Sequence, residues 1–188
     1  MAKKVAIIFG GPKKESNTHL LVKEAQRGLA DAGVESEIIF LNDLSIKGCQ
    51  DCGYCKAHDP VDCAVKDDMQ QVRRAMERAD AILVATPVYY GSVTAQTKLW
   101  QDRLYAYVKP GRSLLGPKKI GFIFTQNNPD EKLFLSSLQI FMSLMKMAGL
   151  EQAGYLVVPN LLKGVKPMVT ENALYLSRAY DLGKNLLR

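Results

Sequence analysis

The 188-residue sequence lacks any apolar run long enough for a membrane-spanning helix. Its first residues, Met1 to Lys4, lead directly into a short apolar run, without the separate apolar region and small-residue cleavage site of a secretory signal. We therefore expect a cytoplasmic protein without a membrane partner. The length and an apolar content of 47% predict one domain over residues 1–188, with a sizeable buried core.

The sequence also lacks long runs of charge of one sign. Its net charge at neutral pH is +6, but Lys and Arg are scattered in short pairs such as Lys3-Lys4 and Arg73-Arg74. A nucleic-acid interface usually gathers such residues on one face or along one helix. Scattered charges are more typical of a solvated surface, so we expect no nucleic-acid partner.

Two common nucleotide-binding motifs are missing. Residues 10–18 read GGPKKESNT, which matches neither the G-x-G-x-x-G dinucleotide fingerprint nor the G-x-x-x-x-G-K-[ST] loop of nucleotide triphosphatases. Histidine is scarce too, with two residues in the chain, and we expect His19 on the surface of a helix. No side chain is assigned as a catalytic acid or base.

Cysteine is absent outside one short stretch, where four residues follow the spacing C-x2-C-x2-C-x7-C: Cys49, Cys52, Cys55 and Cys63. This pattern excludes a disulfide framework, which would join distant segments. Thiolates bind soft metals and iron–sulfur clusters, so the four are candidate ligands of a 4Fe–4S cluster. Structural zinc and free thiols remain open, although zinc loops usually pair two separated C-x2-C elements. All four lie in an irregular stretch, residues 42–66, which we name the cysteine-rich segment.

Strands and helices alternate along the chain. Short apolar runs predict five strands, at residues 4–9, 35–41, 81–86, 119–124 and 154–158. Segments of helical periodicity predict five helices, at residues 18–32, 67–79, 93–107, 131–148 and 170–187. Such alternation predicts an α/β fold: a five-stranded parallel sheet in the order 2-1-3-4-5 between helical layers, a flavodoxin-like three-layer sandwich. Ligands then bind beyond the carboxyl ends of strands 1 and 3.

The loop after the first strand could hold a phosphate. Two glycines allow the backbone to bend, and a Ser-Asn-Thr run stands where a helix begins. Helix N-termini favour anions because their first N–H groups lack partners. The candidate residues are Gly11, Pro12, Lys13, Ser16, Asn17 and Thr18. Simple capping of the helix by Ser16 or Asn17 is the alternative interpretation.

The loop after the third strand could border a flat heterocycle. Pro87 is expected to end that strand, and Gly91 allows close approach of the backbone. Aromatic side chains suit packing against a large ring. The candidate residues are Pro87, Val88, Tyr89, Tyr90, Gly91 and Ser92. Packing of the two tyrosines against neighbouring helices or another subunit is the alternative.

These motifs resemble those of the flavodoxin-like NAD(P)H-dependent FMN reductase family. The pattern G-[GS]-P-[KR]-x-x-S-N-T resembles its FMN-phosphate loop, and P-V-Y-Y-G-S-V-T-A-Q-T-K-x-x-x-D-R, from Pro87 to Arg103, resembles its isoalloxazine loop and following helix. The cysteine run resembles that of the family's iron–sulfur flavoprotein branch. The resemblance implies noncovalent FMN, held by the two loops, in a homodimer or homotetramer. A third loop, after the fourth strand, would approach the ring from its other side with Thr125, Gln126, Asn127 and Asn128.

The expected function is therefore that of a flavin-dependent oxidoreductase. The resemblance implies NAD(P)H as electron donor, a small-molecule or protein electron acceptor, and a 4Fe–4S cluster on the four cysteines. FMN would supply the chemistry, and the protein would orient it. Two alternatives are a non-enzymatic electron carrier of the flavodoxin type and a zinc-stabilised interaction module without flavin.

Overall fold

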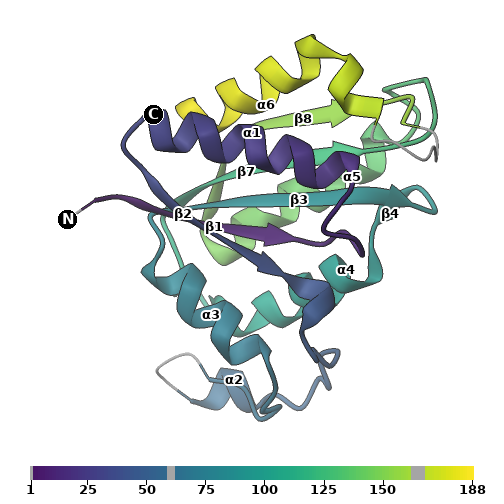
Figure 1. The fold of residues 1–188 in the computed structure, drawn as a ribbon. Helices are drawn as coiled ribbons and strands as arrows, with labels where there is room; N and C mark the ends of the chain where they lie inside the picture. The colour runs from purple at the N-terminus through teal and green to yellow at the C-terminus, as the bar shows by residue number, and fades with distance from the viewer. Residues whose placement is uncertain (1, 59–61, 162–167) are drawn as a thin grey trace.

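A parallel β-sheet forms the centre of the molecule, with helices on both faces (Figure 1). The computed structural model describes residues 2–58, 62–161 and 168–188. The parallel strands are β1 (Lys4–Phe9), β2 (Glu35–Phe40), β3 (Ala81–Tyr89), β7 (Lys118–Thr125) and β8 (Leu150–Val158). Their spatial order is β2-β1-β3-β7-β8, which confirms the predicted 2-1-3-4-5 arrangement of parallel strands.

The two faces of the sheet bury separate apolar cores. In β1, Val5, Ile7 and Phe9 pack with helices α1 (Asn17–Asp31) and α6 (Ala173–Asn185). Ile8 packs on the other side with Trp100, under helices α3 (Met69–Arg78), α4 (Ala95–Arg103) and α5 (Leu135–Leu144). This alternation follows from the period of a strand, whose successive side chains point to opposite faces. The three-layer sandwich expected from the sequence is therefore confirmed.

Strand β3 is longer than predicted, because Pro87 does not end it. Pro87 pairs with Thr125 of β7 in the last position of their ladder, where a missing N–H removes a single terminal bond. The chain continues to Tyr89, turns, and returns as the short antiparallel strand β4 (Ser92–Val93). The expected loop at residues 87–92 is thus a β-hairpin.

Strand β8 also begins earlier than predicted, at Leu150 instead of Gly154. After the buried Leu150, Glu151 and Gln152 are exposed at the edge of the sheet, so this part of the strand has no apolar run. The pairing with β7 shifts register between Ile120 and Gly121, which marks a β-bulge. The start of β8 could not be predicted from apolar runs, because it is mostly exposed and polar and is interrupted by a bulge.

Several short elements were not predicted. They are η1 (Leu41–Asp43), α2 (Tyr54–Ala57), β5 (Val108–Lys109) and β6 (Arg112–Ser113). The 3-10 turns η2 (Leu104–Tyr107), η3 (Met145–Ala148) and η4 (Met168–Glu171) fall wholly or partly within the helices predicted at 93–107, 131–148 and 170–187. The cysteine-rich segment contains η1 and α2 and lies beside α3 and α4 (Figure 1). Of the helices that the structure describes, none has the length and apolarity needed to cross a membrane.

Candidate functional site

A cleft of about 1180 Å³ opens at the carboxyl ends of β1, β3 and β7. Three loops border it, and they follow those three strands. The cleft is lined by the predicted residues Gly11, Pro12, Lys13, Ser16, Asn17, Thr18, Pro87, Val88, Tyr89, Tyr90, Gly91 and Thr125. The remaining predicted residue, Ser92, is exposed and pairs with Tyr89 in the hairpin instead of lining the cleft.

The first loop ends in a capped helix. The Ser16 side chain accepts a hydrogen bond from the His19 N–H (3.3 Å) and donates one to the Lys13 carbonyl (3.1 Å). Ser16 is therefore the N-cap of α1, as the capping interpretation proposed. A cap satisfies one N–H of the first turn, and the N–H groups of the neighbouring positions stay directed at the cleft end of the helix. Capping and anion binding are thus compatible at this position.

Side chains of the first loop also join it to other segments. The Thr18 and Thr125 hydroxyls lie 2.6 Å apart and are buried, so they link the first loop to the third. The Asn17 side-chain oxygen accepts a hydrogen bond from the Val169 N–H (2.9 Å). These two side chains are therefore structural, and their backbone N–H groups are the better candidates for a phosphate.

The buried side chain of Thr94 is hydrogen-bonded to the start of the same loop. Thr94, the N-cap of α4, donates a hydrogen bond to the Gly10 carbonyl (2.7 Å) and contacts the Thr97 hydroxyl (2.9 Å). A Cβ atom at Gly10 would lie 1.8 Å from the Thr97 hydroxyl oxygen, so glycine is required there. The helix that follows the hairpin therefore fixes the first loop in place.

The hairpin presents two aromatic rings at the mouth of the cleft. Tyr90 and Gly91 both have positive φ, 51° and 75°, which is the pattern of a type I′ turn. Tyr90 is fully exposed and Tyr89 is 49% exposed. Packing of both rings against helices of the same chain, one of the alternatives considered for this loop, is therefore wrong. Gly91 is held by the Ser137 hydroxyl, which donates to its carbonyl.

The third loop contributes a buried amide, Gln126, for which the sequence predicted a place beside the cofactor but no specific contact. Gln126 is 3% exposed, and its side-chain N–H groups donate to the carbonyls of Asn128 (3.3 Å) and Asp130 (2.7 Å). Its side-chain oxygen is buried and has no hydrogen-bond partner among the described residues. Such an acceptor favours a ligand that brings an N–H or O–H group into the cleft. The signal for it was the amide run after the fourth predicted strand.

Other residues of the lining carried no clear signal in the sequence. They are Glu15, Pro129, Phe134 and Leu161, whereas Asn127 and Asn128 belong to the third loop that was expected to border the cofactor. Phe134 lies against Gly91, where a Cβ atom would come within 3.2 Å of its ring. Loop residues brought together by the fold in this way have no local pattern that distinguishes them.

The sequence predicted a surface position for His19, but in the structure its side chain is half-buried on α1. Its ring packs edge-on against Phe9 (5.7 Å between centroids) and Phe40 (5.4 Å). Burial in this apolar setting, helped by the charge of Lys23, lowers the pKa of His19 from its ordinary value of 6.5.

The four cysteines are free thiols in this structure. Cys49 and Cys52 are exposed, whereas Cys55 and Cys63 are half-buried. Within residues 2–58, 62–161 and 168–188, no three His, Cys, Asp or Glu side chains are gathered so that they could hold a metal ion. The donor set suits a cluster chemically, but the described conformation does not surround one centre, so this assignment stays a prediction.

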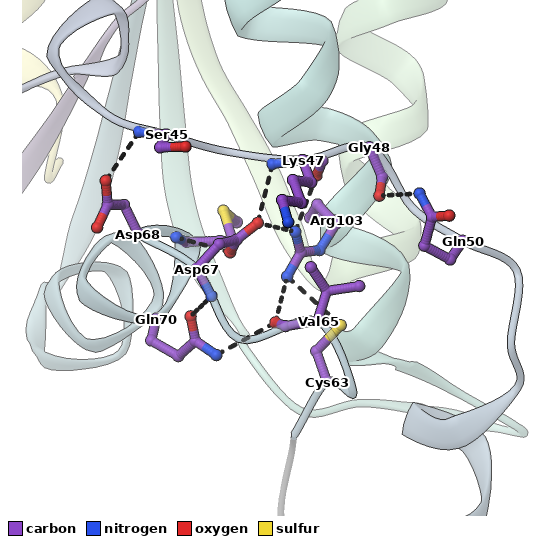
Figure 2. A network of polar contacts seen from close by, with 11 residues as sticks. Ser45, Lys47, Gly48, Gln50, Cys63, Val65, Asp67, Asp68, Gln70 and Arg103 are labelled. Carbon is purple, nitrogen blue, oxygen red and sulfur yellow. Dashed lines mark hydrogen bonds and ion pairs between the residues drawn. The ribbon is translucent and has the colours of Figure 1, made fainter.

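A buried ion pair lies next to the cysteines (Figure 2). Arg103 Nη1 is 2.8 Å from Asp67 Oδ2, and the two side chains are 2% and 5% exposed. Burial alone would raise the pKa of Asp67, but hydrogen bonds from Arg103 and the Lys47 N–H hold it below the ordinary 3.8. Burial would likewise lower the pKa of Arg103, but the hydrogen bond to Asp67 and the nearby Cys63 raise it above its ordinary value. Both groups are therefore charged at neutral pH.

Comparison with known proteins agrees with this geometry. The sequence model of the family described as NADPH-dependent FMN reductase matches residues 3–156. An iron-sulfur flavoprotein of Methanocaldococcus jannaschii is 41% identical over 100 residues, which are 53% of this chain and 51% of that protein. An iron-sulfur flavoprotein of Archaeoglobus fulgidus is 37% identical over 100 residues, 53% of this chain and 44% of that protein. The chain spans about half the length of the curated relatives it matches.

A solved structure shares the fold over the whole chain. An NAD(P)H:quinone oxidoreductase from Methanothermobacter marburgensis superposes with a TM-score of 0.79, covering 100% of this chain and 98% of that one. The sequence identity is 19%, so this likeness concerns the fold.

Proposed function

The chain belongs to the NADPH-dependent FMN reductase family, and on this basis we propose that it is an FMN-dependent oxidoreductase. It takes electrons from NAD(P)H and passes them to a small-molecule or protein acceptor. The observation that carries the proposal is the cleft at the carboxyl ends of β1, β3 and β7, bordered by three loops. Ligands of open parallel sheets bind at this place, where the strand order reverses.

The residues of the cleft suit FMN. The first turn of α1 offers N–H groups and the positive end of the helix dipole to the phosphate, and Lys13 adds a positive charge. Tyr89 and Tyr90 offer aromatic faces beside the space for the ring system. The unpartnered oxygen of Gln126 suits a hydroxyl or ring N–H of the cofactor. Bound FMN would supply hydride acceptance and single-electron release, while these residues hold and orient it.

The four cysteines are the proposed ligands of a 4Fe–4S cluster. Support comes from the names of the relatives in Methanocaldococcus jannaschii and Archaeoglobus fulgidus, and from four free thiols on one segment. Such a cluster would supply single-electron exchange. Binding requires the cysteine-rich segment to bring the thiols closer together than they lie in the described conformation.

We also propose that two copies of the chain associate through α5 and the hairpin. Ile140, Leu144 and Met147 are exposed on one side of α5 and η3, at the i, i+4 and i+7 positions of a helical face. The exposed rings of Tyr89 and Tyr90 continue this surface, because Ser137 of α5 binds the hairpin at Gly91. We propose a second copy of the chain as the partner of this face, since the face adjoins the cleft in each chain.

The central experiment measures cofactor binding. Purified protein is titrated with FMN, and separately with riboflavin, which lacks the phosphate, while flavin fluorescence is recorded. We expect FMN to be quenched and to co-elute with the protein, and NADH or NADPH to reduce it under anaerobic conditions. The proposal is overturned if excess FMN shows no quenching and does not co-elute with the protein. Bound FMN that neither nicotinamide reduces would indicate an electron carrier.

The phosphate contact is tested by Lys13→Gln. Loss of an exposed charge beside the phosphate should weaken FMN binding by roughly 2- to 5-fold, because such contacts contribute about 0.5–1 kcal/mol. Riboflavin binding should not change. Lys3→Gln, an equal charge change outside the cleft, is the matched control. Equal effects on FMN and riboflavin would rule out the phosphate assignment of this loop.

A further inference from the structure

Arg103 is a buried cation that the flavin cleft does not use. It is the last residue of α4, and its side chain is 2% exposed. Figure 2 shows its guanidinium between the two ends of the cysteine-rich segment, with Lys47 on one side and Cys63 to Asp67 on the other. A buried guanidinium is costly unless its donors are satisfied, so its partners indicate what it does.

Among the described residues, the four hydrogen bonds of its side chain reach that segment or the residue that follows it. Nη1 donates to the Lys47 carbonyl (2.9 Å) and to Asp67 Oδ2 (2.8 Å). Nη2 donates to the Val65 carbonyl (3.1 Å) and to Cys63 Sγ (3.4 Å). The planar fork of Arg can serve several acceptors at once, whereas Lys offers one point charge. One side chain therefore fixes two chain segments and one predicted ligand.

The two ends of the segment are also bonded to each other. The Lys47 N–H donates to Asp67 Oδ2 (2.8 Å), and the Ser45 N–H donates to Asp68 Oδ2 (2.8 Å). Asp67 thus receives Arg103 and the opposite end of the segment on the same oxygen. These bonds hold residues 45–47 and 65–68 together, and we name these two stretches the neck of the segment. The four cysteines lie in the chain between them.

A second cation holds the segment on its far side. Lys109 Nζ donates to the carbonyls of Cys55 in α2 (2.7 Å) and of His58 at the end of that helix (2.8 Å). Lys56 of α2 donates in turn to the carbonyls of Tyr105 and Val108. The cysteine-rich segment is therefore bound to the rest of the molecule through the stretch from Arg103 to Lys109. The sulfur of Cys63 is bonded directly by a cation, Arg103.

We propose that Arg103 is the positioning residue of the predicted cluster site: it anchors the neck of the cysteine-rich segment and the Cys63 sulfur to α4, and its N–H bond to that sulfur raises the reduction potential of the centre. The second half rests on the proposed cluster. Reduction adds negative charge, so a hydrogen bond and a positive charge at a ligand sulfur favour the reduced state. The anchoring half needs no metal.

Hydrogen exchange of the metal-free protein tests the anchoring. The variant Arg103→Lys keeps the positive charge but loses the guanidinium that bonds several acceptors at once. The double variant Asp67→Asn with Arg103→Gln removes both buried charges, so that neither is left unpaired in the folded protein. We expect the amides of residues 45–47 and 63–68 to exchange about tenfold faster in both variants, as for the loss of one hydrogen bond. Lys118→Met is the matched control, because Lys118 donates to the carbonyls of Met76 and Glu77, away from the cysteines. Unchanged exchange at the neck, or equal acceleration in the control, overturns the anchoring.

The midpoint potential after anaerobic reconstitution with iron and sulfide tests the second half. We expect Arg103→Lys to give a more negative potential than the wild type and Lys118→Met to leave it unchanged. Equal potentials in wild type and Arg103→Lys overturn this half. Wild-type protein that takes up no iron overturns the cluster proposal and this half with it. The exchange experiment still decides the anchoring, so the two failures are distinguishable.

Discussion

At the scale of single residues, polar side chains in this fold join loops that are distant in sequence. Thr18 meets Thr125, Thr94 meets the Gly10 carbonyl, and each pair is buried. Bonds of this kind are stronger in a dry interior, and they are costly to leave half-made. These bonds therefore fix the positions of the loops that border the cleft.

His19 is expected to make stability depend on pH. Its pKa in the folded chain is below 6.5, the value we take for the unfolded chain, because burial beside Phe9 and Phe40 disfavours the charged ring. As pH falls through that value, the unfolded chain binds a proton that the folded chain resists, so the free energy of unfolding decreases. Urea unfolding of FMN-free protein between about pH 7.5 and about pH 5.5 measures this effect.

The variant His19→Leu keeps an apolar group between the two rings and should flatten that pH dependence. His58→Gln, at the other histidine, is the control and should retain it. A wild-type protein with equal stability at both ends of the range would show that His19 is accessible to protonation in the folded state.

At the scale of elements, the hairpin combines strain with exposure. Tyr90 holds a positive φ of 51°, which costs a side chain with a Cβ atom about 1–2 kcal/mol. Asn tolerates this conformation better, so Tyr90→Asn should stabilise the FMN-free protein by about 1 kcal/mol. The same change should weaken FMN binding, because it removes an aromatic face from the cleft.

Urea unfolding and FMN titration of the same variant measure the two effects. Tyr155→Asn changes another exposed tyrosine, in the extended backbone of β8, and should bring no gain in stability. A variant at Tyr90 that binds FMN as tightly as the wild type would remove this ring from the proposed site.

The contact between α1 and α6 depends on two glycines. A Cβ atom at Gly183 would lie 2.0 Å from the Ala25 carbonyl oxygen, and one at Gly28 would lie 2.1 Å from that of Tyr180. Gly→Ala within a helix usually stabilises by about 0.5–1 kcal/mol. Here we expect Gly183→Ala to destabilise by about 1–3 kcal/mol, since backbone atoms must separate. Thermal unfolding compared with Ser177→Ala, at an exposed position of α6, decides the sign.

The elements that the sequence predicted well are those with continuous apolar runs. Residues 4–9 match β1 at both ends, because every position from Val5 to Phe9 is buried. The start of β8 was missed because edge positions can be polar, and the end of β3 because proline is tolerated where a ladder stops. Local pattern predicts burial, and it fails where an element is exposed.

At the scale of the whole molecule, the exposed face of α5 predicts association. Ile140 is 63% exposed, and Ile140→Lys should weaken the proposed dimer at least about tenfold, because it places a charge in an apolar contact. Light scattering during size-exclusion chromatography measures the change. Leu174→Lys is the matched control, since Leu174 is also 63% exposed but lies in α6 on the other face of the sheet. A wild-type monomer at micromolar concentration would contradict the proposal.

The cleft was predictable from sequence to the extent that its loops follow strands in a known topology. Loop positions such as Lys13 and Tyr89 could be named, because the strand order brings their strands together. The buried, unpartnered oxygen of Gln126 and the place of Phe134 against Gly91 could not be predicted, since both depend on how the third loop folds back. The single domain, the cytoplasmic location and the absence of a nucleic-acid partner stay predictions.

Helix α4 connects the two predicted redox sites. Thr94 at its start bonds the first loop of the cleft, and Arg103 at its end bonds the neck of the cysteine-rich segment. Its nine residues rise about 1.5 Å each, so they set a span of about 13 Å. Both loops can therefore accept substitutions while the separation stays constant. One residue inserted into this helix would lengthen the gap by about 1.5 Å and rotate Arg103 by about 100°, away from its sulfur.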